Sequence, residues 1–366
     1  MFLSNLLRIE GWHKIISRVS RSNPDHSRRT RSTVVRLSWP NFEKVHSNFS
    51  YFCRYNGAIA TCSKFSRLPE LGAVVAVALV QQQCSTPKVV LPLKGRFEGW
   101  KPLHTFTICP APWNREYSNI GEFLQYIEVN GMFGADHFIF YNISVSPSLQ
   151  PYIDHYLASG KIEIVQWDLP VIIEQGPKNE IHYFGQLMAI SDCLYRAYLS
   201  SQFVVFLDMD EVIVPMKSDS WLDIIPRGIF NKTSAAVIRN TFLRKEWNQD
   251  TRFAENQFLK RFPIDALLYT KREQNIWSAR SRSKYIARPE CIEIPGIHYP
   301  FSLRCGTVFT PNPSDAIMMH YRNWEDYKDG QPQIPEQRMH VFSEQILKRV
   351  QTIVETVDHQ NFKPLR

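Results

Sequence analysis

From residue 104 onward, the apolar positions alternate between the spacing of buried strands and the spacing of amphipathic helices. Apolar runs at 104–110, 135–143 and 161–170 have the length and the aromatic and β-branched content of buried strands. The intervening segments 118–132 and 149–160 place apolar residues at helical intervals instead. Strands and helices that alternate through short connections predict an α/β fold with a largely parallel sheet and crossover helices.

The first of these helices has clear expected limits. Its apolar face carries Ile120, Leu124 and Ile127 at the i, i+4, i+7 positions. Ser118 is the expected N-cap, and Gly131 is the expected end of the helix.

A third helix, 184–200, leads directly into the segment FVVFLDMDEVIVP at 203–215. Beyond that segment the alternation weakens, and strand-like runs at 234–242, 265–270 and 284–288 stand among arginine-rich loops. The last apolar periodicity predicts a closing amphipathic helix over 336–357, with apolar residues at Val341, Ile346, Val350 and Val354. The chain has neither a dinucleotide-binding glycine fingerprint nor a P-loop.

The charge is concentrated at the front of the chain. The formal net charge is +8, and the first 36 residues hold eight of the basic residues against Glu10 and Asp25. This distribution is typical of a solvated basic leader and argues against a nucleic-acid groove. The apolar run at 71–80 is about half the roughly 20 residues that a membrane-spanning helix needs, so we expect a buried strand there.

Cysteines and glycosylation sequons suggest the secretory pathway. None of the seven cysteines forms a CxxC pair, and four of them (Cys53, Cys62, Cys84 and Cys109) predict one or two disulfides in the first 109 residues. Three Asn-x-Ser/Thr sequons begin at Asn48, Asn142 and Asn231.

Three acids interrupt the apolar segment 203–215: Asp208, Asp210 and Glu211. Parallel sheets bind ligands beyond the carboxyl ends of their strands, and residues i and i+2 of a strand point to one side. Two converging carboxylates repel each other, and Mg²⁺ or Mn²⁺ relieves that repulsion. This D-x-D signature fits two mechanisms. One is a phosphatase of the haloacid-dehalogenase type, and the other is a sugar-nucleotide glycosyltransferase whose metal stabilises the departing diphosphate.

Several stretches together resemble glycosyltransferase family 92, formerly domain of unknown function 23. They are CPAPWNREYSNIGEFLQYIEVNGMFGADHFIFYN, GQLMAISDCLYRA, FVVFLDMDEVIVP, KYIARPECIEIPGIH and AIMMHYRNW, which run in family order from Cys109 to Trp324. The resemblance implies a GT-A fold, which is Rossmann-like with a mostly parallel central sheet and flanking helices. It also implies an inverting transfer, a UDP-sugar donor with galactose as the best-known sugar, glycan acceptors, Mn²⁺ and a type II Golgi membrane topology. A catalytically silent sugar-binding relative is the alternative from a different class.

The resemblance also implies a division of the chain. Residues 1–100 form a basic leader and irregular stem-like region without a convincing anchor. Residues 101–360 form the GT-A domain, with 101–215 as the nucleotide-binding half, 216–330 as the acceptor half and 336–357 as the closing helix.

Asp208 and Asp210 match the D-x-D of the family, with Asp210 expected on the metal and Asp208 on the donor ribose and the metal. A downstream histidine is the expected third ligand, and His298 is favoured slightly over His320. The further residues expected to bind the donor are Lys284 and Arg322, at the diphosphate, and Asp192 and Gln186, on the helix before the D-x-D.

An inverting transfer also needs a general base in the acceptor half. Glu246 is preferred over Asp250 and Glu255 because Trp247 beside it can stack on a sugar ring. Glu211 is a further possible contact to the donor sugar.

Overall fold

The structure, a computed structural model, describes residues 101–169, 181–226, 231–323 and 332–361, together with the backbone of six strands in the first 92 residues. These strands are β1 (Ile16–Arg21), β2 (Thr33–Arg36), β3 (Phe42–Lys44), β4 (Ala58–Ala60), β5 (Val74–Val80) and β6 (Val89–Pro92). They form an antiparallel sheet of order β2-β1-β5-β6 and an antiparallel β3-β4 pair, where the sequence predicted an irregular segment. The apolar run at 71–80 therefore contains the predicted strand, β5.

The chain divides into two compact units, one of residues 1–101 with 168–188 and one of 102–167 with 189–366. In the described residues, no helix is both long and apolar enough to span a bilayer. Cys53, Cys62, Cys84 and the sequon at Asn48 lie outside the described residues.

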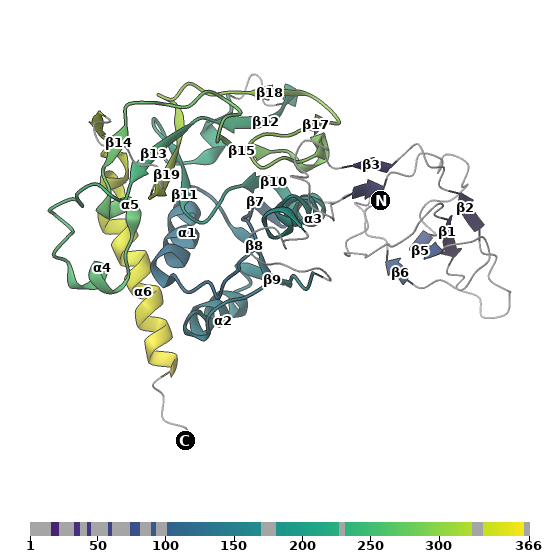
Figure 1. The fold of residues 1–366 in the computed structure, drawn as a ribbon, viewed down its shortest axis with the longest axis horizontal. Coiled ribbons are helices and arrows are strands. Elements are labelled where there is room, and N and C mark those ends of the chain that lie inside the picture. Colours follow the sequence, from purple (N-terminus) through teal and green to yellow (C-terminus); the bar gives the residue numbers. More distant parts are fainter. Residues whose placement is uncertain are drawn as a thin grey trace. The chain divides into compact units, whose positions relative to one another are not determined.

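The larger unit is built on a seven-stranded sheet of order β18-β12-β15-β10-β7-β8-β9 (Figure 1). Every neighbouring pair is parallel except the two pairs that β15 makes with β10 and β12, which are antiparallel. The predicted α/β fold class with a mostly parallel central sheet is confirmed. The strands are β7 (His104–Cys109), β8 (His137–Asn142), β9 (Ile162–Gln166), β10 (Ser201–Phe206), β12 (Thr233–Ile238), β15 (Lys284–Ala287) and β18 (Thr307–Phe309).

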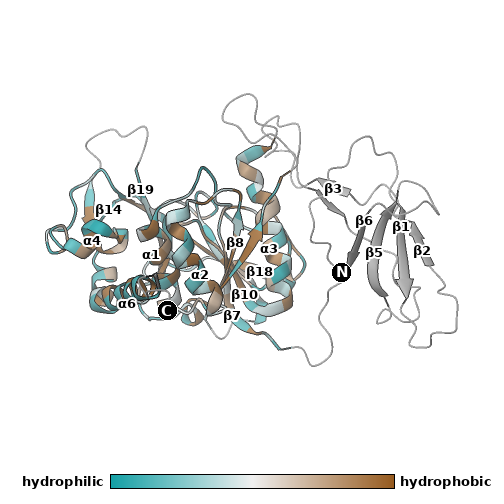
Figure 2. Cartoon of the chain, turned by 90° about the horizontal axis from the view of Figure 1, so that it is seen from below, coloured by the Kyte–Doolittle hydropathy of each residue, from teal (hydrophilic) through white to brown (hydrophobic). Residues whose placement is uncertain are grey.

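Helices cover this sheet because β7, β8 and β9 are each followed by an amphipathic helix that leads to the next parallel strand, and a last helix closes the chain. The helices are α1 (Ile120–Met132), α2 (Gln150–Ala158), α3 (Gln186–Ser200) and α6 (Ser343–Asn361). In Figure 2 the apolar strands β8 and β10 lie between α3 on one side and α1 and α2 on the other. Asn119, not the predicted Ser118, caps α1 by accepting a 3.1 Å hydrogen bond from the Glu122 amide.

A smaller sheet of order β11-β19-β13 carries the second half of the segment 203–215. Its strands are β11 (Glu211–Pro215), β13 (Asn240–Arg244) and β19 (Ala316–Arg322), and β19 runs antiparallel to β11 and parallel to β13. The run 234–242, predicted as one strand, is therefore divided between β12 and β13, which belong to different sheets.

The remaining described elements are short: α4 (Gln257–Arg261), α5 (Asp265–Leu268), β14 (Lys271–Glu273), β16 (Ile292–Ile294), β17 (Ser302–Leu303) and β20 (Gln333–Pro335). The run 265–270 was predicted as a strand and is instead mostly the helical turn α5. The closing helix begins at Ser343, later than predicted. Val341 is 71% exposed in the preceding turn, whereas Ile346, Val350 and Val354 are buried as predicted.

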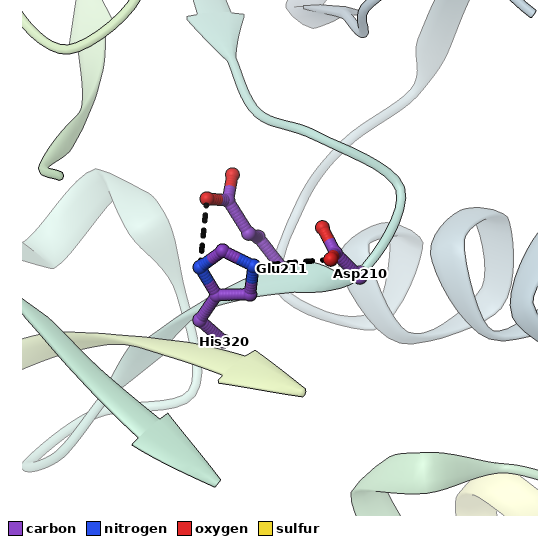
Figure 3. A group of neighbouring side chains, drawn as sticks. All are labelled: Asp210, Glu211 and His320. Carbon is purple, nitrogen blue, oxygen red and sulfur yellow. Dashed lines mark hydrogen bonds and ion pairs between the residues drawn. The ribbon is translucent and has the colours of Figure 1, made fainter. Parts of the chain in front are cut away.

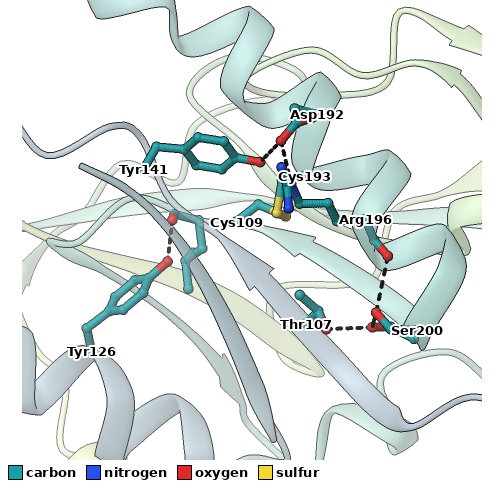
Figure 4. Close-up of a disulfide and its surroundings, with 10 residues drawn as sticks. Thr107, Cys109, Tyr126, Tyr141, Asp192, Cys193, Arg196 and Ser200 are labelled. Carbon is teal, nitrogen blue, oxygen red and sulfur yellow. Dashed lines mark hydrogen bonds and ion pairs between the residues drawn. A yellow bond between two sulfur atoms is a disulfide. The ribbon is translucent and has the colours of Figure 1, made fainter. Parts of the chain in front are cut away.

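Two disulfides lie in the described part of the chain. Cys109, at the end of β7, pairs with Cys193 of α3 (Figure 4), and Cys291 pairs with Cys305. Cys109 therefore takes no part in the one or two disulfides expected in the first 109 residues, because the crossover helix returns Cys193 to the carboxyl end of β7. The other three cysteines of that expectation lie outside the described residues. The first bridge closes 84 residues of chain beside the candidate site described below.

A histidine pair at the opposite, amino end of β7 and β8 makes stability depend on pH. His104 and His137 stack with centroids 4.1 Å apart, and His137 is buried with its Nδ1 lacking a hydrogen bond. Burial, and then the charge of His104, lower the pKa of His137 from 6.5 to about 4. The folded state therefore binds fewer protons than the unfolded state between these values, and stability falls as the pH falls through this window.

We expect the free energy of unfolding to drop by on the order of 2 kcal/mol between pH 6.5 and pH 4 because His137 resists protonation. Urea unfolding across this range measures the slope, and His137→Gln is expected to flatten it. An unchanged slope in the variant would assign the acid sensitivity to other groups.

Candidate metal centre and active site

The D-x-D acids lie on a turn that joins the two sheets, not on a strand. β10 ends at Phe206 and β11 begins at Glu211, so the expected i, i+2 alternation does not apply to Asp208 and Asp210. The Glu211 carboxylate closes the turn by accepting a 2.8 Å hydrogen bond from the Asp208 amide. The buried Tyr126 hydroxyl of α1 donates to the Leu207 carbonyl at 2.6 Å. The backbone of the turn is therefore held from both sides.

Asp210, Glu211 and His320 converge on one point, as Figure 3 shows. Nε2 of His320 lies 3.0 Å from Asp210 Oδ2, and its Nδ1 lies 3.4 Å from Glu211 Oε1. His320 is brought there by the pairing of β19 with β11, which sets it directly opposite Glu211. One potential ligand atom from each residue lies within 4.8 Å of the other two.

The donor set of this group fits a divalent cation. Nδ1 of His320 is buried and makes no hydrogen bond, and the charged atom that faces it, Glu211 Oε1 at 3.4 Å, belongs to the same group. Two carboxylates and one imidazole suit Mn²⁺ better than Mg²⁺, which prefers oxygen ligands only. Within the described residues, this is the one His/Cys/Asp/Glu group of three that meets the spacing of a metal site.

Lys284 of β15 balances the other side of the acidic turn. It is buried, and its Nζ lies 2.6 Å from Asp208 Oδ2 and 3.4 Å from Glu211 Oε2. Asp208, expected on both donor and metal, is thus engaged by a lysine, whereas Asp210 is engaged by the histidine. Lys284 was expected at the diphosphate, but its contacts in the structure are to carboxylates.

Burial and charge set the protonation of the acids in opposite directions. Burial raises the pKa of Glu211 to about 7, against the opposing charge of Lys284. Burial also opposes ionisation of Asp210, but the charge and hydrogen bond of His320 outweigh it and lower the pKa of Asp210. Burial lowers the pKa of His320, but the negative charges of Asp210 and Glu211 have the larger combined effect. The pKa of His320 is therefore raised above its usual value.

The other predicted histidine lies outside this group. Nδ1 of His298 lies 3.2 Å from the carbonyl of Ser283, and burial followed by the charge of Lys284 lowers the pKa of His298 to about 4. The geometry therefore favours His320 as the third ligand, where the sequence slightly favoured His298. Arg322 lies two residues beyond His320 on β19, so both belong to the same face of the small sheet.

The residues predicted on α3 have different surroundings. Asp192 accepts a 2.7 Å hydrogen bond from Tyr141 and a 2.6 Å hydrogen bond from Arg196, beside the Cys109–Cys193 disulfide (Figure 4). It therefore lies near the carboxyl ends of β7 and β8. Gln186 is buried at the first position of α3.

The candidate bases differ in how fully their oxygens are engaged. Asp250 accepts hydrogen bonds from Arg252 and from Thr270, and these bonds lower its pKa, which weakens it as a base. Glu255 is 87% exposed and paired with Lys260. Glu246 lies two residues beyond the end of β13, beside the buried Trp247, whose ring lies 5.8 Å from the Arg244 guanidinium.

Sequence reasoning did not identify Glu122 or Tyr117, which lie at the start of α1. The Tyr117 hydroxyl donates to Glu122 at 2.9 Å. Burial, and then the negative charge of Asp210, raise the pKa of Glu122 to about 7. An acid in the first turn of a helix is common because it interacts favourably with the helix dipole. The sequence around Glu122 therefore gives no sign that this residue lies near Asp210.

The candidate site residues all lie in the part of the chain that is similar to known proteins. A sequence model described as Glycosyltransferase family 92 matches residues 104–357. A β-1,4-galactosyltransferase, galt-1, of Caenorhabditis elegans is 24% identical over 199 residues, which is 54% of this chain and 42% of the relative. A glycosyltransferase family 92 protein of the same organism is 28% identical over 100 residues, which is 26% of this chain and 20% of the relative.

Each of these matches spans less than half the length of the curated relative. Among solved structures, a crystal structure of GalNAc-T7 with UDP, GalNAc and Mn²⁺ aligns with a TM-score of 0.32 and 12% identity. The alignment covers 69% of this chain and 48% of that one.

Proposed function

The chain belongs to glycosyltransferase family 92, and on this premise we propose that it is a metal-dependent, inverting glycosyltransferase that uses a UDP-sugar donor and a glycan acceptor. Galactose is the proposed sugar, supported by the similarity to a relative named as a β-1,4-galactosyltransferase. The observation that carries the proposal is the convergence of Asp210, Glu211 and His320 on the turn between the two sheets.

This arrangement suits the departure of a nucleoside diphosphate. Asp210 and His320 would hold Mn²⁺, with Glu211 as the remaining ligand or as the group that orients His320. When bound, the cation supplies positive charge where the leaving diphosphate develops negative charge. The Lys284 ammonium holds the Asp208 carboxylate at 2.6 Å, so that carboxylate can orient a donor hydroxyl.

The acceptor half supplies the remaining step. A carboxylate there takes the proton of the attacking hydroxyl on the face opposite the leaving group. Glu246 remains the proposed base, supported by its position two residues beyond β13, beside Trp247, and by the hydrogen bonds that engage both oxygens of Asp250.

We also propose a secretory location, as a type II protein of the Golgi membrane. The support is the family resemblance together with two disulfides in the described residues, because structural disulfides persist in oxidising compartments. Asn231 is exposed and accessible to glycosylation, whereas the Asn142 side chain lies 3.4 Å from Gln166 at the end of β8.

The test is a transfer assay with the purified full chain, Mn²⁺, a panel of UDP-sugars and a glycan array. We expect metal-dependent release of UDP together with a glycan whose mass has increased by one sugar. Phosphate released from a phosphomonoester without a sugar product would support the haloacid-dehalogenase alternative. Binding of glycans with no turnover of any donor would support the silent relative.

A further inference from the structure

Arg282 is linked to the metal group through the ring of Phe242. It belongs to the loop between β14 and β15, two residues before Lys284. Its guanidinium carbon lies 5.6 Å from the ring centre of Phe242 and 5.3 Å from that of Trp277. Phe242 in turn packs on the imidazole of His320, with ring centroids 5.0 Å apart. One aromatic ring therefore separates Arg282 from a candidate metal ligand.

The small sheet positions this aromatic platform. Phe242 of β13 pairs with His320 of β19, which is opposite Glu211 of β11, so the three side chains occupy one face. Trp277 meets Phe242 edge-on at 6.0 Å, and its amide donates to the Asn240 carbonyl at 2.9 Å. A guanidinium on two rings that are themselves fixed loses little further freedom on binding a ligand.

A second arginine lies on the small sheet. Arg322 is two residues beyond His320 on β19 and is opposite Arg244 of β13, so it shares the face that carries His320 and Phe242. The negative charge of Glu273 favours ionised Arg282. Glu273 already accepts a 2.6 Å hydrogen bond from Arg244. With a divalent cation at Asp210, this region carries an excess of positive charge.

The backbone holds the loop in an unusual conformation. Arg280 and Arg282 have φ values of +72° and +56°, in the left-handed region that costs a non-glycine residue on the order of 1 kcal/mol or more. The Arg280 amide donates to Ser283 Oγ at 3.1 Å, and Arg239 holds the loop by donating to the Trp277 carbonyl at 2.9 Å. Strain of this kind, supported by surrounding contacts, is typical of segments that position a functional side chain.

We propose that Arg282, together with Arg322, binds the diphosphate of the donor and of the leaving nucleotide. The inference rests on the proposed function and adds a positioning residue to it. The planar guanidinium presents paired N–H donors that match phosphate oxygens, and the aromatic platform fixes it beside Phe242, whose ring contacts the imidazole of His320.

The test measures binding of Mn²⁺ alone, and of inorganic pyrophosphate and UDP in the presence of Mn²⁺, by calorimetry on the full chain. We expect Arg282→Gln to weaken the binding of both diphosphates at least about tenfold, to leave Mn²⁺ affinity within about twofold, and to lower the melting temperature little more than the control below. Arg280→Gln is the matched control, because it removes an arginine of the same strained loop that lies instead over Tyr299 at 5.4 Å. Arg282→Lys should recover part of the loss as a point charge.

Unchanged diphosphate affinity in Arg282→Gln would overturn the inference, as would a wild-type protein that binds neither ligand. Equal losses in Arg282→Gln and Arg280→Gln, or an equal loss of Mn²⁺ affinity, would assign Arg282 to holding the loop and also overturn it. If the wild type binds pyrophosphate through Arg282 but transfers no sugar from any donor, the inference stands and the proposed function fails.

Discussion

Replacing Asp210 with asparagine is expected to abolish metal binding at micromolar Mn²⁺ and to lower sugar transfer by at least about a hundredfold. The substitution keeps the shape of the side chain but removes the charge that the cation and His320 both require. Asp210 lies 3.0 Å from His320, and this pairing lowers its pKa, so the wild-type residue is ionised and ready to bind metal at neutral pH. Mn²⁺ titration by calorimetry and the transfer assay measure the two effects separately.

Variants of the two candidate histidines serve as a control for this prediction, because only His320 lies beside Asp210. His320→Gln should reproduce the loss of Mn²⁺ affinity, whereas His298→Gln should leave it nearly unchanged, because Nδ1 of His298 lies against the Ser283 carbonyl. Asp358→Asn, in the partly exposed part of α6, controls for the loss of one acid. Normal Mn²⁺ affinity and transfer in Asp210→Asn would refute the assignment of this group as the metal site.

The nucleotide-binding half was predictable because its elements are long and their apolar periods are unambiguous. Ile127 and Leu124 of α1 are fully buried, as their spacing requires, and the three strands at 104–166 follow the predicted order. In the second half the elements are short, and four residues do not determine a period. The run 265–270 has strand-like residues, but Lys245 holds Asp265 at 2.8 Å and Gln125 accepts from the Ala266 amide, so tertiary contacts select a helical turn.

The sequence identified the D-x-D motif of the candidate site, but it did not predict which side chains the two acids contact. The carboxylates of Asp208 and Asp210 differ because their partners, Lys284 and His320, lie 76 and 110 residues away on different strands. No local pattern in the sequence specifies which acid meets which cation. The turn between β10 and β11 likewise depends on β11 joining a second sheet, which the continuous apolar run 203–215 conceals.

Replacing Lys284 with methionine is expected to destabilise the apo protein by about 3–5 kcal/mol, the cost of removing one partner from a buried ion pair. Lys284 and Glu211 are each 2% exposed, and the lysine is 2.6 Å from Asp208 and 3.4 Å from Glu211. The opposing negative charges keep Lys284 ionised, so burial does not neutralise it. Urea unfolding of the full chain in the absence of metal measures the loss, and Lys232→Met, at an exposed position, is the control.

The loss should also depend on pH in a direction that identifies its cause. Glu211 already has a pKa of about 7, raised from 4.5 by burial, and loss of the lysine raises it further. A carboxyl with a raised folded pKa is tolerated when protonated and costs stability as the pH rises through that value, so the deficit should be larger at pH 8 than at pH 5. Adding Glu211→Gln to Lys284→Met should restore part of the stability, because the neutral amide has no charge to bury. A deficit that is constant with pH and unaffected by the second substitution would show that Lys284 acts through packing and not through its charge.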